Sequence, residues 1–200
     1  TVNALGGTAI TGATSLSYVP PTSATGTLYY YCIATYNSGG CTTATSNIAQ
    51  VVVNPIQTIT TQPLVTQDIC IGGTIPALTV AYTGGVGTAT YQWYSNSTNT
   101  NSGGLLISGA TLSSYTPSVF TTAGDYYYYA TVTLSGSGCN SVSSTTALVH
   151  VVADPTVSIT PSSQTICQGT TPTDLVVTPS GGVGTYNYQW YNSPSNTLIT

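Results

Sequence analysis

Tyr91-Gln92-Trp93-Tyr94 follows the glycine-rich turn Gly84-Gly85-Val86-Gly87, and both stretches return 97 residues later. The second copies are Tyr188-Gln189-Trp190-Tyr191 and Gly181-Gly182-Val183-Gly184. Upstream, Gly12-Ala13-Thr14 stands 97 residues before Gly109-Ala110-Thr111. Self-similarity at a fixed spacing of this size is typical of tandem repeats. The chain is therefore expected to be a series of similar domains.

The residues around Trp93 predict a strand with one buried face. From Ala89 to Tyr94, Tyr91 and Trp93 share one face of a period-two alternation, and Leu78 and Val80 alternate in the same way. Trp93 and its copy Trp190 are expected in the core. No segment has an apolar period of 3.6 residues, so helices should be almost absent. We expect an all-β fold of tandem β-sandwich domains, each with about seven antiparallel strands.

The joints between domains are short and contain proline. Val51-Val52-Val53-Asn54-Pro55 and Val151-Val152-Ala153-Asp154-Pro155 each run from a last strand into a proline, which stops a sheet from continuing. Their prolines are 100 residues apart, the usual size of a sandwich domain. We predict a C-terminal half-repeat over 1–54, a complete repeat over 55–153 and an N-terminal half-repeat over 154–200. Without glycine or serine runs, the joints should give a semi-rigid string.

These motifs resemble two groups of known domains. The strand pattern, the tryptophan of the third strand and Tyr30-Tyr31-Cys32, which matches the tyrosine corner, resemble immunoglobulin-like (Ig-like) repeats. The Tyr-x-Trp pattern is similar to polycystic-kidney-disease-type domains, although Tyr94-Ser95-Asn96 stands where that family has an acidic stretch. Together with Cys-x-Gly-Gly and Gly-Ala-Thr, the motifs resemble repeats of giant secreted Bacteroidota surface proteins of the gliding-motility-adhesin type. The resemblance implies a secreted, surface-exposed, Ig-like chain.

The composition excludes several classes of function. The chain has no Lys or Arg, and its net charge of −4 comes from Asp68, Asp125, Asp154 and Asp174. An acidic chain is repelled by nucleic acids and by anionic membrane surfaces. No apolar run is long enough to span a membrane, so we expect neither nucleic-acid binding nor membrane insertion. With 2% charged residues, the surface should favour lateral self-association.

The five cysteines suggest disulfides. Cys70 and Cys139 belong to the complete repeat, while Cys41 and Cys167 are the copies that each half-repeat contains. We predict a Cys70–Cys139 bond, with the partners of Cys41 and Cys167 outside this stretch of sequence. Two partners are open for Cys32: a residue outside the chain, or Cys41. Zinc is the rival interpretation, but no Cys-x-x-Cys supports it. Disulfides would indicate an extracellular setting, at the cell surface or secreted.

The sequence contains no catalytic constellation, and we predict neither an enzyme nor a cofactor or metal site. His150 lies between Val149 and Val151 in a predicted last strand, where a structural role is favoured over a catalytic one. The four aspartates are scattered, so Asp154 is expected in a turn rather than in a calcium clamp. The Gly84–Gly87 turn has no lysine for a phosphate and should only join two strands.

The remaining candidate contact surface is aromatic. If Tyr128 faces the core, neighbouring tyrosines face outward; the predicted set is Tyr94, Tyr127, Tyr129, Tyr29 and Tyr31. Such rings could stack on sugars or on a neighbouring fibre. The alternative is that they pair across strands and stabilise the outer face.

Two functions follow as expectations. The first is a structural section of a long extracellular fibre or adhesin stalk, whose partners are the neighbouring repeats, laterally associated strings and surface glycans. The second is a carbohydrate-binding module that uses exposed tyrosines, possibly appended to a secreted enzyme.

Overall fold

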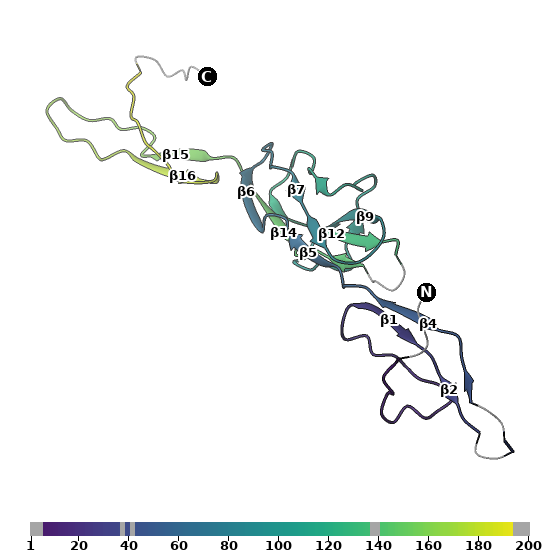
Figure 1. Cartoon of the computed structure of the whole chain (residues 1–200). Helices are drawn as coiled ribbons and strands as arrows, with labels where there is room; N and C mark the ends of the chain where they lie inside the picture. Colours follow the sequence, from purple (N-terminus) through teal and green to yellow (C-terminus); the bar gives the residue numbers. More distant parts are fainter. Residues whose placement is uncertain (1–5, 37–38, 41–42, 137–140, 194–200) are drawn as a thin grey trace.

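A computed structural model describes residues 6–36, 39–40, 43–136 and 141–193. Over these residues the chain is all-β, with strands and turns and no helix, which confirms the predicted fold class. No described helix could therefore cross a membrane. Figure 1 shows three parts in a row: an N-terminal part that contains β1 (Gly26–Tyr30), a larger middle part, and a C-terminal part that contains β15 (Thr156–Thr160).

The middle part contains most of the strands. They are β5 (Thr58–Thr61), β6 (Thr66–Cys70), β7 (Leu78–Thr79), β8 (Ala81–Thr83), β9 (Ala89–Asn96), β10 (Leu105–Leu106), β11 (Ser114–Tyr115), β12 (Gly124–Leu134), β13 (Val142–Ser143) and β14 (Ala147–Val152). Short apolar runs separated by Gly, Ser, Thr and Pro turns account for this succession of strands.

One large sheet organises the middle part. Its order is β10–β9–β12–β14–β6, and β13 also pairs with β12. β9 and β12 are antiparallel, whereas β6 joins the edge of β14 in parallel. The two-stranded pairs β5–β8 and β7–β11 make up the remaining strands. The order β9–β12–β14 is that of the C, F and G strands of an Ig-like domain. The Ig-like assignment and the repeat boundaries stay predictions.

The predicted last strand, Ser143 to Val152, is interrupted. It is divided between β13 and β14, and Ser144 lies between them, fully buried. The Ser144 side-chain oxygen accepts a hydrogen bond from the Ala130 N–H at 3.0 Å. A serine side chain therefore replaces part of the strand ladder at this point.

Trp93 lies at the centre of the core, as predicted. Its side chain is 0% exposed, and its ring centroid lies 5.9 Å from that of Tyr115. The indole N–H donates a hydrogen bond to the Leu112 carbonyl at 3.0 Å, so its burial leaves no polar atom unpaired. The other fully buried apolar positions include Leu78, Val132, Val149 and Val151. They come from β7, β12 and β14, so the core lies between the large sheet and the β7–β11 pair.

The N-terminal part repeats the pairing of β12 with β14. It consists of β1, β2 (Ile33–Ala34), β3 (Ala44–Thr45) and β4 (Ala49–Val53). In β1 and β4, Gly26 pairs with Val53, just as Gly124 pairs with Val151 at positions 98 residues later. The serine bond returns as well, since Ser46 accepts from the Cys32 N–H at 2.9 Å. Residues that match in sequence thus make the same hydrogen bonds.

The C-terminal part repeats the pairing of β5 with β8. Its strands are β15 and β16 (Val176–Ser180), which are antiparallel from Thr156–Ser180 to Thr160–Val176. The Gly182 N–H donates to the Ala153 carbonyl at 2.8 Å, and the Gly85 N–H donates to the Pro55 carbonyl at the same distance. Each predicted joint is therefore hydrogen-bonded to the Gly-Gly turn that follows it in sequence.

The Gly-Gly turn needs glycine for two reasons. Gly84 and Gly181 have φ values of +77° and +76°, in the left-handed region that favours glycine. A Cβ on Gly84 would lie 2.2 Å from the Ile56 carbonyl oxygen, and one on Gly181 would lie 2.6 Å from that of Asp154. The turn thus lets the joint backbone pass in close contact, which fits the expectation of a semi-rigid string.

Cys70 lies at one end of the middle part. Cys70 lies beside Val152, near the start of β12, where Gly124 pairs with Val151. Cys139 and Cys41 lie outside the described residues. The described residue that precedes Cys139, Gly136, follows the far end of β12, a strand of 11 residues that is roughly 35 Å long. A disulfide needs Cα atoms about 4.4–6.8 Å apart. The Cys70–Cys139 bond stays a prediction, because Cys139 lies outside the described residues. Cys32, Cys70 and Cys167 form no disulfide with any described residue.

We expect Cys70→Ser to change the free energy of unfolding by less than about 1 kcal/mol, because Cys70 forms no disulfide with any described residue. Loss of a disulfide closing a loop of this length would cost about 4 kcal/mol instead. Urea unfolding of the variant and of the wild type, each with and without reductant, separates the two values. If the variant lost much stability, and reductant caused the same loss in the wild type, the result would show that the intradomain disulfide forms.

Candidate functional site

The predicted tyrosine surface lies on the outer face of β9 and β12. The rings of Tyr94 and Tyr129 stack with centroids 5.0 Å apart and planes 10° apart. Tyr129 is 4% exposed, and its hydroxyl accepts a hydrogen bond from the Gly104 N–H at 3.1 Å. Tyr94 and Tyr127 are half-buried. The prediction that Tyr129 is an exposed contact residue is wrong, because the loop ending at Gly104 covers it.

The same arrangement recurs in the N-terminal part. The Tyr31 hydroxyl accepts a hydrogen bond from the Gly7 N–H at 3.2 Å, and Tyr31 is half-buried. Tyr29 is 48% exposed, and it is the one member of the predicted set that is open to solvent. These contacts support the structural alternative, in which the tyrosines pack against neighbouring strands and loops.

Tyr128 faces the core, as expected, and Tyr126 makes the bond of a tyrosine corner. Burial, followed by the charges that Tyr115 and Tyr126 would carry, raises the pKa of Tyr128 to about 12. The hydroxyl of Tyr126 donates to the Thr122 carbonyl four residues upstream at 3.0 Å. From the sequence, the tyrosine corner was expected at Tyr30-Tyr31-Cys32 in the N-terminal part. The residue there that corresponds to Tyr126 is Leu28, which has no hydroxyl to make this bond. Tyr30 instead packs against Tyr18, with the ring centroids 5.6 Å apart.

His150 is part of an exposed ion pair. Its Nδ1 lies 2.5 Å from an Asp125 carboxylate oxygen on β12, and Asp68 is its neighbour on β6. The hydrogen bond to Asp125, with smaller effects from the charges of Asp125 and Asp68, raises the pKa of His150. No described nucleophile accompanies the pair among its hydrogen bonds, so the arrangement fits the structural role that was favoured from the sequence.

The raised pKa gives His150 a definite pH dependence. A group whose pKa is raised on folding stabilises the folded state fully below its unfolded pKa, near 6.5. That stabilisation is lost as the pH rises through the higher folded pKa. We therefore expect NMR titration to place the pKa of His150 above 6.5, and Asp125→Asn to lower it. An unchanged pKa in Asp125→Asn would contradict the ion pair.

Other predicted alternatives do not come together into a site. No group of three or more His, Cys, Asp or Glu among the described residues could hold a metal ion. Asp154 and Asp174 are exposed in different stretches of the C-terminal part. The Gly84–Gly87 turn joins β8 to β9, as expected for a turn between strands.

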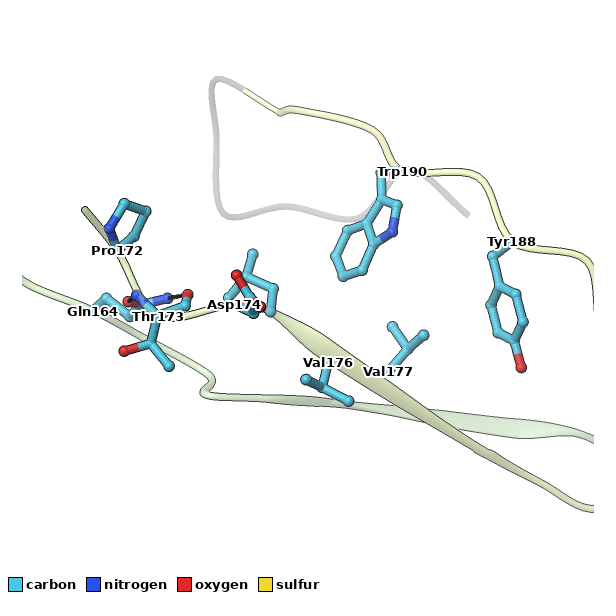
Figure 2. Close-up of a pocket in the computed structure, with 9 residues that line it drawn as sticks. Gln164, Pro172, Thr173, Asp174, Val176, Val177, Tyr188 and Trp190 are labelled. Carbon is cyan, nitrogen blue, oxygen red and sulfur yellow. Dashed lines mark hydrogen bonds between the residues drawn. The ribbon is translucent and has the colours of Figure 1, made fainter.

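An open apolar surface lies in the C-terminal part. Residues 164–190 line a shallow, open hollow of about 810 Å³, and Figure 2 shows Trp190 and Tyr188 on one side of it, facing Val176 and Val177 on the other. Its lining consists of Gln164, Pro172, Thr173, Asp174, Leu175, Val176, Val177, Tyr188 and Trp190. Four of these are the counterparts, 97 residues later, of Leu78, Val80, Tyr91 and Trp93. The hollow is therefore lined in part by the counterparts of core residues of the middle part.

The environment of Trp190 differs from that of Trp93. Trp190 is 50% exposed although it was expected in the core, and Leu175 is 46% exposed whereas its counterpart Leu78 is 1% exposed. In the middle part, Trp93 is covered by Leu112 and Tyr115, which follow it in sequence. No corresponding residues cover Trp190 in the described chain. Identical motifs thus have different burial because burial depends on residues distant in sequence, such as Leu112 and Tyr115 for Trp93.

Residues 60–153 match a protein family described as a domain of unknown function (DUF8696). The match lies within the predicted complete repeat, and it identifies the middle part as similar to a recurring domain. No curated protein matches the chain.

Proposed function

We propose that this chain is a structural section of a long extracellular fibre or adhesin stalk built from tandem Ig-like repeats. The observation that carries the proposal is the reuse of the same backbone contacts in successive copies. The N–H groups of Gly85 and Gly182 each donate a hydrogen bond to the predicted joint that precedes them. The side chains of Ser46 and Ser144 each accept a hydrogen bond from a backbone N–H at corresponding positions. A repeated domain with a fixed joint holds each domain at a set orientation to the next, so a series of them forms an extended structure such as a stalk.

The composition supports a scaffold rather than a reaction centre. A chain without Lys and Arg offers no cleavage site to trypsin-like proteases, an advantage for a fibre outside the cell. Its low charge also leaves few repulsive groups between neighbouring strings. The proposal assigns no catalytic step to these repeats and places them at the cell surface or in secreted material.

Self-association of the protein should depend little on salt. With no cation except His150, it must depend on apolar side chains and backbone edges, which salt does not screen. We expect the association constant from sedimentation velocity to change less than about threefold between 50 mM and 500 mM NaCl. A steep loss of association at high salt would contradict the proposed absence of electrostatic attraction.

The carbohydrate-binding alternative has weaker support. Stacking on a sugar needs an accessible ring face, whereas the rings of Tyr94 and Tyr129 cover each other. Tyr29 alone of the predicted set is open, so the structure does not favour a second function.

Immuno-electron microscopy of the source cells tests the proposal. Antibodies raised against residues 55–153 should label filaments at the cell surface at several points along their length. The control is the same antibody after absorption with the purified 200-residue protein. Label confined to the cytoplasm, or to single globular particles, would overturn the assignment to an extracellular fibre.

A further inference from the structure

Strand β6 forms one edge of the large sheet of the middle part. Figure 1 shows it beside β14, with which it pairs in parallel, and parallel pairs are slightly less stable per residue than antiparallel ones. The chain is anchored on both sides of this strand. Before it, the Thr145 N–H donates to Gln62 Oε1 at 2.8 Å, and after it the Gly72 N–H donates to the Phe120 carbonyl at 2.8 Å. Local opening can therefore be confined to β6, with the antiparallel strands of the sheet left in place.

A row of three ionisable side chains crosses the sheet at this edge. His150 on β14 lies directly opposite Asp125 on β12 and Asp68 on β6. Residues that are directly opposite each other share one face of a sheet, and all three are exposed. The Nδ1 of His150 lies 2.5 Å from an Asp125 carboxylate oxygen, and Asp68 comes from the strand on the other side. The only histidine of the sequence therefore stands between two carboxylates.

The opposite face of β6 buries a polar group that lacks a partner. Gln67 is 9% exposed, and its Nε2 makes no hydrogen bond to any described residue. Its counterpart Gln164 makes two bonds of 2.7 Å to the backbone of Thr173, since Nε2 donates to the carbonyl and Oε1 accepts from the N–H. In the middle part, Pro76 stands in the place of Thr173 and has no N–H. Because a buried donor without a partner is costly, Gln67 favours opening of β6, which exposes its amide to water.

We propose that β6 is a pH-sensitive edge strand, which protonated His150 holds closed through Asp68 and which opens locally when His150 loses its proton. Opening lets Gln67 reach water and leaves the backbone of β14 as an open sheet edge, the kind of edge that pairs with other strands. The pH then sets how much open edge the middle part exposes. The inference concerns this one part of the chain and does not depend on the proposed fibre.

The direction of the response follows from the groups around His150. The hydrogen bond to Asp125, together with the charges of Asp125 and Asp68, raises the pKa of His150 against an opposing effect of desolvation. The stabilisation by the protonated ring is therefore complete below about pH 6.5 and is lost as the pH rises through the higher folded pKa. Cys70 and Tyr127 lie on the same face of the neighbouring strands, but thiols and phenols ordinarily titrate only above about pH 8. His150 is thus the group of this face whose charge changes near neutral pH.

Hydrogen exchange of the purified 200-residue protein, followed by mass spectrometry, tests the proposal. The protection of β6 amides, corrected for the intrinsic effect of pH on exchange, should fall about two- to fivefold from about pH 5.5 to about pH 8, as for loss of an exposed charge pair. Strand β9 is paired on both sides, with β10 and β12, so its protection should stay constant and serves as the internal control. Equal changes in β6 and β9, or no change in β6, would overturn the proposal.

Two neutral variants separate the hold on β6 from the ion pair with Asp125. Asp68→Asn removes the carboxylate on β6, so the protection of β6 should no longer change with pH, while NMR should still place the pKa of His150 above about 6.5. Asp125→Asn keeps Asp68, so β6 should still respond, with its midpoint at a lower pH. The matched control is Asp174→Asn, an exposed carboxylate of the C-terminal part, which should leave the response as in the wild type. A pH response of β6 that persists in Asp68→Asn would contradict the hold by His150.

Gln67→Met tests the buried amide separately. Methionine has a similar shape but no polar hydrogen, so the protection of β6 should rise roughly fivefold or more at every pH, and the response to pH should keep its size. Gln164→Met is the matched comparison. It removes two hydrogen bonds that are formed, so it should lower the protection of the Thr173 amide instead. Lower protection of β6 in Gln67→Met would show that the closed strand needs this amide, and would overturn its role in opening.

Discussion

Trp93→Ala is expected to lower the free energy of unfolding of the middle part by about 3–5 kcal/mol. Trp93 is fully buried, contacts Tyr115 and donates to the Leu112 carbonyl. Its removal leaves a cavity and an unpaired carbonyl between the two layers. A domain of this size has a total stability of about 5–15 kcal/mol, so the variant should be partly unfolded at 37 °C. Urea unfolding followed by circular dichroism measures the loss.

Trp190→Ala provides the matched control for this effect. The two tryptophans stand in the same motif, but Trp190 is half exposed and belongs to the open C-terminal part. At a protein concentration low enough for monomers, its substitution should change the main unfolding transition by less than about 1 kcal/mol. Equal destabilisation by the two substitutions would contradict the division of the chain into one closed and one open core.

Gly84→Ala is expected to destabilise the middle part by about 3 kcal/mol. An alanine at a φ of +77° costs about 1–2 kcal/mol, and its Cβ would lie 2.2 Å from the Ile56 carbonyl oxygen. The backbone at the joint must then move, which costs a further 1–3 kcal/mol or so. Thermal unfolding and the loss of the joint hydrogen bond in hydrogen exchange would both report the change.

Gly109→Ala is the control that measures the backbone strain without the steric contact. Gly109 has the same φ of +77°, but no atom lies within 4 Å of the position of an added Cβ. Its substitution should cost only the strain, about 1–2 kcal/mol. If Gly84→Ala lowered the free energy of unfolding no more than Gly109→Ala, this would contradict the close contact between the joint and the Gly-Gly turn.

Local features of the fold could be predicted from the sequence, because they depend on short-range patterns. The alternation around Trp93 identifies a strand with one buried face, and the Gly-Gly turn marks where it begins. The spacing of the motifs also identifies corresponding residues, such as Ser46 and Ser144, which make the same bond. A period of two residues and a positive φ are properties of neighbouring residues, so a single sequence records them.

Features that depend on distant segments could not be predicted in this way. The outward face of Tyr129 was predicted correctly, but its burial depends on the loop before Gly104. The occurrence of Cys70 in matching copies gave no information on its place beside Val152, which depends on the pairing of β6 with β14. Trp190 has the motif of a core residue and is still half exposed, because no described residue covers it as Tyr115 covers Trp93. In each case the missing information is a long-range contact.

The axial spacing of the native fibre, measured by cryo-electron microscopy without reduction, tests the central claim most directly. A string of repeats predicts one bead per roughly 100 residues at a spacing of about 35–45 Å, set by the length of strands such as β12. Isolated globular particles, or a fibre without this spacing, would contradict the account.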